Sequence, residues 1–228
     1  MNISVIIPAL NEQAHLERAV RSAWAIEPRE VVVADGGSRD QTRQVAQQLG
    51  CQVLQTAAGR AGQQNAGAAA ADGAVLLFLH ADTWLSPEAG GQLRAALEDR
   101  RVLGGAFRQR IDSPAIVYRW LEWGNARRVQ WLGWAYGDQG LFMRAEVFHE
   151  LGGFPAVGLM EDLLLMKQFR RRRRWPVLLP GPIHVSPRRW ERAGVVRQTL
   201  RNWSLVAALH LGVSPDHLAS YYVRHDRP

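Results

Sequence analysis

The sequence predicts an α/β fold in which helices flank a mostly parallel central sheet. Short apolar runs alternate with helical patterns four times within the first eighty residues. Such runs are typical of strands that are buried on both faces, as in parallel sheets covered by helices. The runs end in acidic residues or in glycine-containing loops, and ligands of open α/β sheets bind beyond this carboxyl edge. The order of elements therefore predicts both the fold class and the place of a binding site.

The first predicted strand covers residues 3–7, a run rich in β-branched residues. We expect Pro8 to end this strand, because proline cannot donate to a sheet ladder. Asn11 is placed to cap the next helix, whose apolar stripe begins at Leu16.

The second predicted strand covers residues 31–34 and has Asp35 at its tip. Gly36 and Gly37 permit a tight backbone there, and Ser38 or Asp40 can cap the helix that follows. Asp35 is either a turn residue or a ligand-binding residue, and its position before two glycines favours binding.

The third predicted strand covers residues 53–55 and leads into a glycine-containing loop at residues 59–67. This loop opens an alanine-rich helix, where backbone amides and Arg60 are suited to face an anion. The alternative is that Arg60 is a surface charge.

The fourth predicted strand, residues 74–79, is followed by His80, Ala81 and Asp82. A carboxylate at this edge can hold a divalent cation against a diphosphate, because hard cations prefer oxygen ligands and retain water and phosphate oxygens. Alternatively, Asp82 only caps the next helix.

Six segments of the chain resemble glycosyltransferase family 2, in the order expected for that family. They are residues 5–12, 33–42, 59–67, 136–144, 151–155 and 160–163. The resemblance implies a GT-A, Rossmann-like nucleotide-sugar domain at residues 1–185, with a helical C-terminal extension at 186–228 packed on it. Residues 79–83 resemble a small bacterial subgroup of soluble, single-domain members.

The same resemblance implies roles for individual residues. The nucleotide-sugar site would comprise Pro8, Ala9, Asn11, Glu12, Asp35, Gly36, Arg60, Asn65, His80 and Ala81. Asp82 matches the metal ligand of the Asp-x-Asp motif, which implies Mn²⁺ or Mg²⁺, and His80 replaces the first acid of that motif. His184 is a second candidate metal ligand, since a late histidine completes the shell in some GT-A enzymes. Asp35 favours a uridine diphosphate sugar, because its carboxylate can accept a hydrogen bond from a base imide.

The catalytic base of the family corresponds to Asp162, with Glu161 beside it. Inverting transfer needs a base for the acceptor hydroxyl and positive charge at the departing diphosphate. A cation on Asp82, with Arg60 or a C-terminal arginine, suits the second requirement. The alternative for the acidic pair is a helix first turn favoured by the helix dipole.

The acceptor side is implied by two further elements. One is the loop with Asp138 and Gln139, whose alternative interpretation is a tight turn between strands. The other is Arg188-Arg189-Trp190, which is similar to the Arg-Trp element of processive members but lacks the leading Gln. The acceptor is expected to be a saccharide, lipid-linked or a small molecule.

Composition fits one enzyme domain of 228 residues that are 47% hydrophobic. The chain has no apolar run of ~18 residues and no visible signal peptide, which predicts a cytoplasmic protein. The single Cys51 excludes an internal disulfide. The net charge of +7 suggests a nucleic-acid or membrane-surface binder, yet no nucleic-acid fold signature is present, so no nucleic-acid partner is expected.

Peripheral contact with the inner membrane face is a further hypothesis. Residues 118–136 combine aromatic and basic side chains, and residues 190–211 read as an amphipathic helix. Its apolar face comprises Val195, Leu200, Trp203, Val206 and Leu209. Core packing against the catalytic domain is the interpretation we favour for both segments.

Three alternative functions stay open. The first is a non-catalytic nucleotide-sugar-binding protein in which His80 has replaced a needed acid, and the second is a membrane-surface binding module. The third is a nucleotidyltransferase, which needs a basic motif in the first loop, where Ala9-Leu10-Asn11 has none. Oligomeric state is open.

Overall fold

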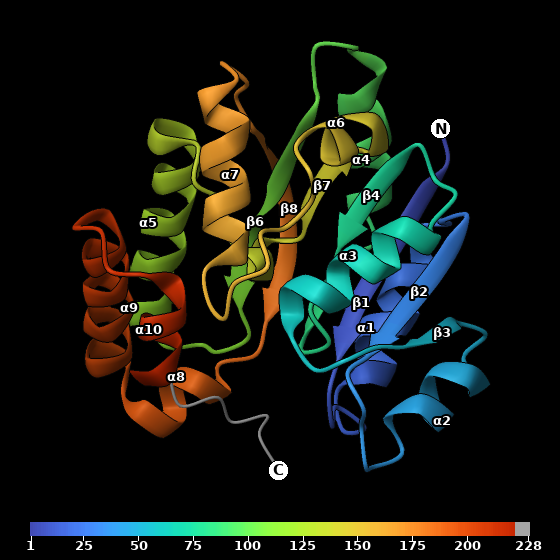
Figure 1. The fold of residues 1–228 in the computed structure, drawn as a ribbon, viewed down its shortest axis with the longest axis horizontal. Coiled ribbons are helices and arrows are strands. Elements are labelled where there is room, and N and C mark those ends of the chain that lie inside the picture. The colour runs from blue at the N-terminus through green and yellow to red at the C-terminus, as the bar shows by residue number, and fades with distance from the viewer. Residues whose placement is uncertain (222–228) are drawn as a thin grey trace.

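A computed structural model describes residues 1–221 of the chain and contains one eight-stranded mixed sheet, in the order β3-β2-β1-β4-β7-β6-β8-β5 (Figure 1). The strands are β1 (Ile3–Ala9), β2 (Glu30–Asp35), β3 (Gln52–Gln55), β4 (Val75–Phe78), β5 (Thr83–Leu85), β6 (Gly104–Ile111), β7 (Leu141–Arg144) and β8 (Val177–Val185). The longer helices are α1 (Leu16–Ala25), α3 (Arg60–Ala70), α4 (Ala89–Glu98), α5 (Ile116–Leu132), α7 (Glu161–Arg171) and α9 (Val195–His210). The shorter ones are α2 (Thr42–Gln48), η1 (Gly137–Gln139), α6 (Ala145–Glu150), α8 (Arg188–Ala193) and α10 (Pro215–Tyr221). The predicted α/β fold is confirmed.

The first four predicted strands form the parallel half of the sheet. All residues of β4 are buried, as its apolar run predicts. One boundary was wrong: β1 does not end before Pro8, which pairs in register with Ala34. The fixed φ of proline is compatible with an extended strand, so β1 continues to Ala9.

The other half of the sheet brings distant segments to the carboxyl edge of β4. The antiparallel β7 starts with Leu141 opposite Phe78, so η1, which precedes β7, lies where β4 ends. Strand β5 pairs antiparallel with β8, and Thr83 lies opposite Val185. The end of β8 therefore lies beside the residue that follows Asp82.

Two apolar cores cover the two faces of the sheet, because successive side chains of a strand point to opposite faces. On β1, Val5 and Ile7 belong to the core formed with α1 and α4, whereas Ile6 belongs to the core formed with α3, α6 and α7. In the second core Phe78 packs edge-on against Phe154 at 4.8 Å between ring centroids. These cores fix the strand ends that carry the polar residues described below.

The C-terminal helices differ from the single helix predicted over 190–211. Gly194, with φ of 81°, separates α8 from α9. Leu200 and Trp203, predicted to face inward, are 57% and 67% exposed. Residues 222–228, the end of the predicted extension, lie outside the described residues, and none of the described helices is both long and apolar enough to cross a membrane.

Candidate active site

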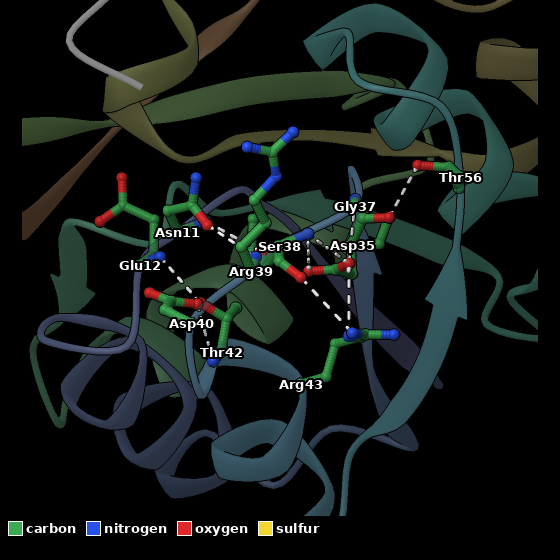
Figure 2. Close-up of polar contacts among 12 residues, drawn as sticks. Asn11, Glu12, Asp35, Gly37, Ser38, Arg39, Asp40, Thr42, Arg43 and Thr56 are labelled. Carbon is green, nitrogen blue, oxygen red and sulfur yellow. Dashed lines mark hydrogen bonds and ion pairs between the residues drawn. The ribbon is translucent and has the colours of Figure 1, made fainter. Parts of the chain in front are cut away.

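The loop after β2 is organised around the buried carboxylate of Asp35 (Figure 2). The carboxylate accepts hydrogen bonds from the backbone N–H of Gly37 and of Ser38, both at 3.0 Å. Arg43 Nε lies 3.9 Å from it. These contacts give Asp35 the turn role that the sequence left as one of two alternatives. Its contact with a base stays a prediction.

The loop after β1 is joined to the loop after β2 by side chains expected to be helix caps. Asn11 does not cap α1. Its Oδ1 accepts from Arg39 N at 2.9 Å, and its own N–H donates to Ser38 Oγ at 2.9 Å (Figure 2). Asp40 Oδ1 accepts from Thr42 N at 3.0 Å, where α2 begins. Asn11 has φ of 54°, a conformation that asparagine tolerates better than most residues, so it shapes the crossing of the two loops.

Gln63 on α3 fixes these strand tips to each other, although the sequence analysis assigned it no role. Its Nε2 donates to the carbonyl oxygens of Ala9 at 2.8 Å and Ala34 at 2.7 Å. A Cβ atom on Gly36 would lie 3.1 Å from the Gln63 amide, so glycine gives this side chain room. A glutamine inside an alanine-rich helix is the signal that could have identified it, because a buried polar group needs partners.

Asp82 is joined to the other end of the chain by Arg188. The Arg188 guanidinium donates to Asp82 Oδ2 at 2.9 Å and to Glu12 Oε1 at 3.2 Å. Burial alone would lower the pKa of Arg188, but the carboxylates of Asp82 and Glu12 hold it above its usual value. The structure thus places Arg188 at the predicted metal ligand rather than at an acceptor.

His80 and Asp162 meet at Gly137, which places the end of β4 against the beginning of α7. Gly137 N donates to Asp162 Oδ2 at 2.6 Å, and Leu163 N donates to Asp162 Oδ1 at 2.6 Å. A Cβ atom on Gly137 would lie 2.6 Å from His80 Nε2 and 3.4 Å from Asp162 Oδ2. Only glycine allows this approach, so the backbone of η1 separates and positions the two side chains.

Glu161, which precedes Asp162 on α7, forms an ion pair with Arg60. Glu161 Oε1 lies 3.6 Å from Arg60 Nη1, and the Glu161 side chain is 3% exposed. Arg60 begins α3 and Glu161 begins α7, so the pair joins two helix N-termini. Arg60 is therefore more than an isolated surface charge, and Glu161 is a buried carboxylate held by a cation.

Three adjoining cavities of about 50, 130 and 510 Å³ contain the candidate residues. The smallest is lined by His80 and Asp82, and the middle one by His80, Glu161 and Asp162. Asp138 and Asn202 line all three. The cavities therefore connect the Asp82 site with the predicted base and with the space between α5 and α9.

Asn202 is a site residue that the sequence analysis missed. It accepts a hydrogen bond from the buried Gln198 at 2.9 Å. The two residues are four positions apart on α9, a spacing that puts them on one helix face. The signal that could have identified them is a pair of polar residues at this spacing within a helix that was interpreted as apolar on its inward side.

Three further predicted site residues make contacts within the fold, and their assigned roles stay predictions. His184 is not brought to Asp82: its ring stacks on Trp84 at 5.4 Å, because alternate residues of β8 point to opposite faces. The Asn65 amide is used by the backbone of Phe154, at 2.8 and 2.9 Å. Gln139 is fully buried and its Oε1 accepts from Arg128 at 2.6 Å, so it supports η1.

The remaining acceptor candidates lie on α8. Trp190 lines two of the cavities and packs edge-on against Tyr118, with ring centroids 6.1 Å apart. Arg189 belongs to the same helix, and its side chain lies outside the described part of the chain. Among the described residues, no three His, Cys, Asp or Glu side chains cluster to enclose a metal ion.

Fold and site together define a glycosyltransferase of the GT-A type. The sequence matches the description Glycosyl transferase family 2 over residues 4–153, more than half of its length. The chain belongs to this family. A relative of similar sequence, an uncharacterized glycosyltransferase of Nostoc sp. (strain PCC 7120), is 41% identical over 96 residues, which are 38% of this chain and 30% of that protein.

Solved structures share the fold. A crystal structure of residues 1–349 of Staphylococcus aureus TarS superposes with a TM-score of 0.64 at 18% identity and covers 82% of this chain and 61% of that one. Glucosyl-3-phosphoglycerate synthase from Mycobacterium tuberculosis, in complex with Mg²⁺ and uridine diphosphate, gives a TM-score of 0.60 at 19% identity, covering 81% of this chain and 69% of that one. The chain thus spans about three fifths of the TarS fragment and under a third of the Nostoc protein.

Proposed function

We propose that the protein is an inverting, metal-dependent glycosyltransferase that moves a sugar from a nucleoside diphosphate donor to an acceptor hydroxyl. The observation that carries the proposal is the meeting of His80, Gly137 and Asp162 at one cavity, beside the Asp82–Arg188 pair. A uridine diphosphate sugar is the donor we favour, since a TarS structure contains UDP-GlcNAc and the mycobacterial synthase was crystallised with uridine diphosphate.

Asp162 is suited to act as the base. The acceptor oxygen attacks the anomeric carbon on the side opposite the diphosphate, its proton passes to the Asp162 carboxylate, and the bond from carbon to the diphosphate oxygen breaks. Each carboxylate oxygen of Asp162 accepts one hydrogen bond from a backbone N–H. Because a carboxylate has about four lone-pair sites, Asp162 keeps capacity for the acceptor hydroxyl. The two backbone contacts hold it in place during transfer.

Positive charge for the departing diphosphate would come from two arginines of the site. Arg188 and Arg60 supply fixed charge near Asp82 and Glu161. The donor set of Asp82 and Glu12 fits Mg²⁺ or Mn²⁺ that keep most of their shell as water and phosphate oxygens, rather than an ion enclosed by protein. Such an ion would neutralise charge that develops on the leaving diphosphate. We place Asp82 as its protein ligand.

The test is Asp162→Asn, which keeps the shape of the side chain and removes the base. Hydrolysis of UDP-glucose, UDP-N-acetylglucosamine and GDP-mannose is measured with Mn²⁺, together with calorimetric binding of uridine diphosphate. We expect unchanged nucleotide binding and a loss of turnover of about 10²–10⁴-fold, the usual contribution of a positioned base. The matched control is Asp72→Asn, which changes a carboxylate whose side chain is 73% exposed.

Turnover in Asp162→Asn equal to that of the unchanged protein would remove Asp162 from the mechanism. Nucleotide binding without turnover in the unchanged protein would instead support the alternative of a non-catalytic nucleotide-sugar-binding protein.

A further inference from the structure

Exposed apolar side chains concentrate on two helices. Of the twelve large hydrophobic side chains that are exposed among the described residues, ten lie on α5, on α9 or on the residue that follows α9. Six of them form what we call the α5–α9 face: Ile116, Trp120, Trp123, Val196, Leu200 and Trp203, each between 55% and 73% exposed. Surface apolar residues are ordinary when scattered, whereas a contiguous patch marks an interaction site.

The α5–α9 face consists of one apolar stripe on each of the two helices. Positions 116, 120 and 123 repeat at intervals of four and three, as do 196, 200 and 203, which is the spacing of one helix face. Tyr118 on α5 packs against Trp190 on α8, shortly before α9 begins, with ring centroids 6.1 Å apart, and Trp134, shortly after α5 ends, packs against His210 at the end of α9 at 4.8 Å. The helices therefore run side by side in the same direction, as Figure 1 shows.

The two stripes flank the mouth of the largest of the three cavities. Trp120 and Trp203 line the cavity of about 510 Å³ and are also 71% and 67% exposed, so each stands at its rim. Asp138 and Asn202 line the same cavity and the one that contains Asp162. A molecule held at the α5–α9 face thus lies next to the cavity that contains the predicted base.

The charged side chains on this face are basic. Arg127 lies between Trp123 and Trp131, with its guanidinium carbon 5.4 Å from each ring centroid. Arg197 is exposed on α9. The sequence has no Asp or Glu at 123–137 or at 192–215. Glu122, the acid on α5, is paired with Arg119 at 2.8 Å.

These features favour a lipid surface over a second copy of the chain. A symmetric dimer would place the same patch of both copies together, which opposes arginines to arginines without carboxylates to pair them. Indole rings are suited to the boundary of headgroups and acyl chains, and arginines there are attracted by anionic lipids. We propose that the α5–α9 face docks on an anionic membrane surface and brings the mouth of the largest cavity to it. Resting on the proposed function, this makes the acceptor a membrane-borne amphiphile.

The experiment is sedimentation of the full chain with vesicles of phosphatidylcholine alone or mixed with phosphatidylglycerol. We expect binding to the anionic vesicles that weakens as salt is raised, because salt screens the charges. The double variant Trp123→Ser, Trp203→Ser should lose binding at least tenfold. The control Trp175→Ser removes an indole that is 46% exposed outside this face and should bind as the unchanged protein does.

A second pair of variants tests the charge. Arg127→Gln with Arg197→Gln should weaken vesicle binding by about fivefold per arginine, following the usual contribution of a basic residue at an anionic leaflet. The control Arg21→Gln with Arg100→Gln removes equal charge from other surfaces and should bind normally. Circular dichroism checks that each variant is folded.

Absence of binding to anionic vesicles, or equal binding by the face variants and their controls, would overturn the proposal. So would a dimer in sedimentation velocity that dissociates in the tryptophan double variant. Calorimetric binding of uridine diphosphate is measured in parallel, so that failure of the membrane proposal is separate from failure of the nucleotide site.

Discussion

Arg188 and a metal ion are expected to compete for Asp82, and Arg188→Ala tests this directly. In the structure the guanidinium lies 2.9 Å from Asp82 Oδ2, so a cation coordinated by that carboxylate must displace it. Removal of Arg188 removes this competitor. We therefore expect Mn²⁺ to bind more tightly to Arg188→Ala than to the unchanged protein.

The magnitude follows from the burial of the pair. The Asp82 side chain is 9% exposed and that of Arg188 27%, so the pair is neither a surface nor a fully buried one. Surface pairs contribute about 0.2–1 kcal/mol, and removing one partner of a buried pair costs about 3–5 kcal/mol. An intermediate value of about 2 kcal/mol corresponds to a change of roughly 30-fold in affinity. We expect a gain of roughly 10- to 30-fold.

The assay is isothermal calorimetry with Mn²⁺ in the absence of nucleotide. Arg192→Ala is the matched control, because it removes an exposed positive charge from the same helix. Arg188→Lys keeps the charge and should stay close to the unchanged protein. If Arg188→Ala and Arg192→Ala bind Mn²⁺ equally, the reasoning is refuted, since the effect would then be one of net charge.

Three further perturbations have defined outcomes. Gly137→Ala should cost about 1–3 kcal/mol of unfolding free energy and reduce turnover, because its Cβ would lie 2.6 Å from His80 Nε2; a normal melt with normal turnover would contradict this placement. Burial lowers the pKa of His184 in the folded protein below the ordinary value of 6.5. As pH falls below 6.5 the imidazole is therefore protonated more readily in the unfolded chain than in the folded one, and the free energy of unfolding decreases. His184→Phe should flatten that fall in urea titrations, and an unaltered slope would show that His184 does not cause it. Burial raises the pKa of Cys51 to about 11, so labelling by iodoacetamide at pH 8 should be slow until urea unfolds the chain, whereas fast native labelling would oppose this.

The parallel half of the sheet is predictable because its signals are local. Strand β4 is apolar throughout since both faces are covered, and its neighbours repeat the same pattern before each loop. The predicted boundary at Pro8 was wrong because we assumed that a residue without a backbone N–H must end the strand. Pro8 instead pairs in register with Ala34 near the end of β1. The C-terminal half depends on pairings between distant strands, which periodicity does not encode.

The sequence predicted which residues lie at the strand ends of the site, but it did not predict which of them contact each other. Asp82 and Asp162 could be named from motifs, whereas the bridge from Asp82 to Arg188 joins positions 106 residues apart. His184 was named from its residue type and its place after a strand-like run. A shift of one residue along β8 changes the face of the sheet to which its ring points, and the sequence does not give this register. Asn202 was missed since an apolar reading of α9 gave its polar pair no weight.

The most direct test of the account is calorimetric titration with uridine, guanosine and cytidine diphosphates, each with and without Mn²⁺, on the unchanged protein and on Asp82→Ala. We expect tight binding of one diphosphate, with uridine diphosphate favoured, that requires Mn²⁺ and is weakened in Asp82→Ala. No binding to any of the three, or binding that ignores both Mn²⁺ and Asp82→Ala, would contradict a metal-dependent nucleotide-sugar site.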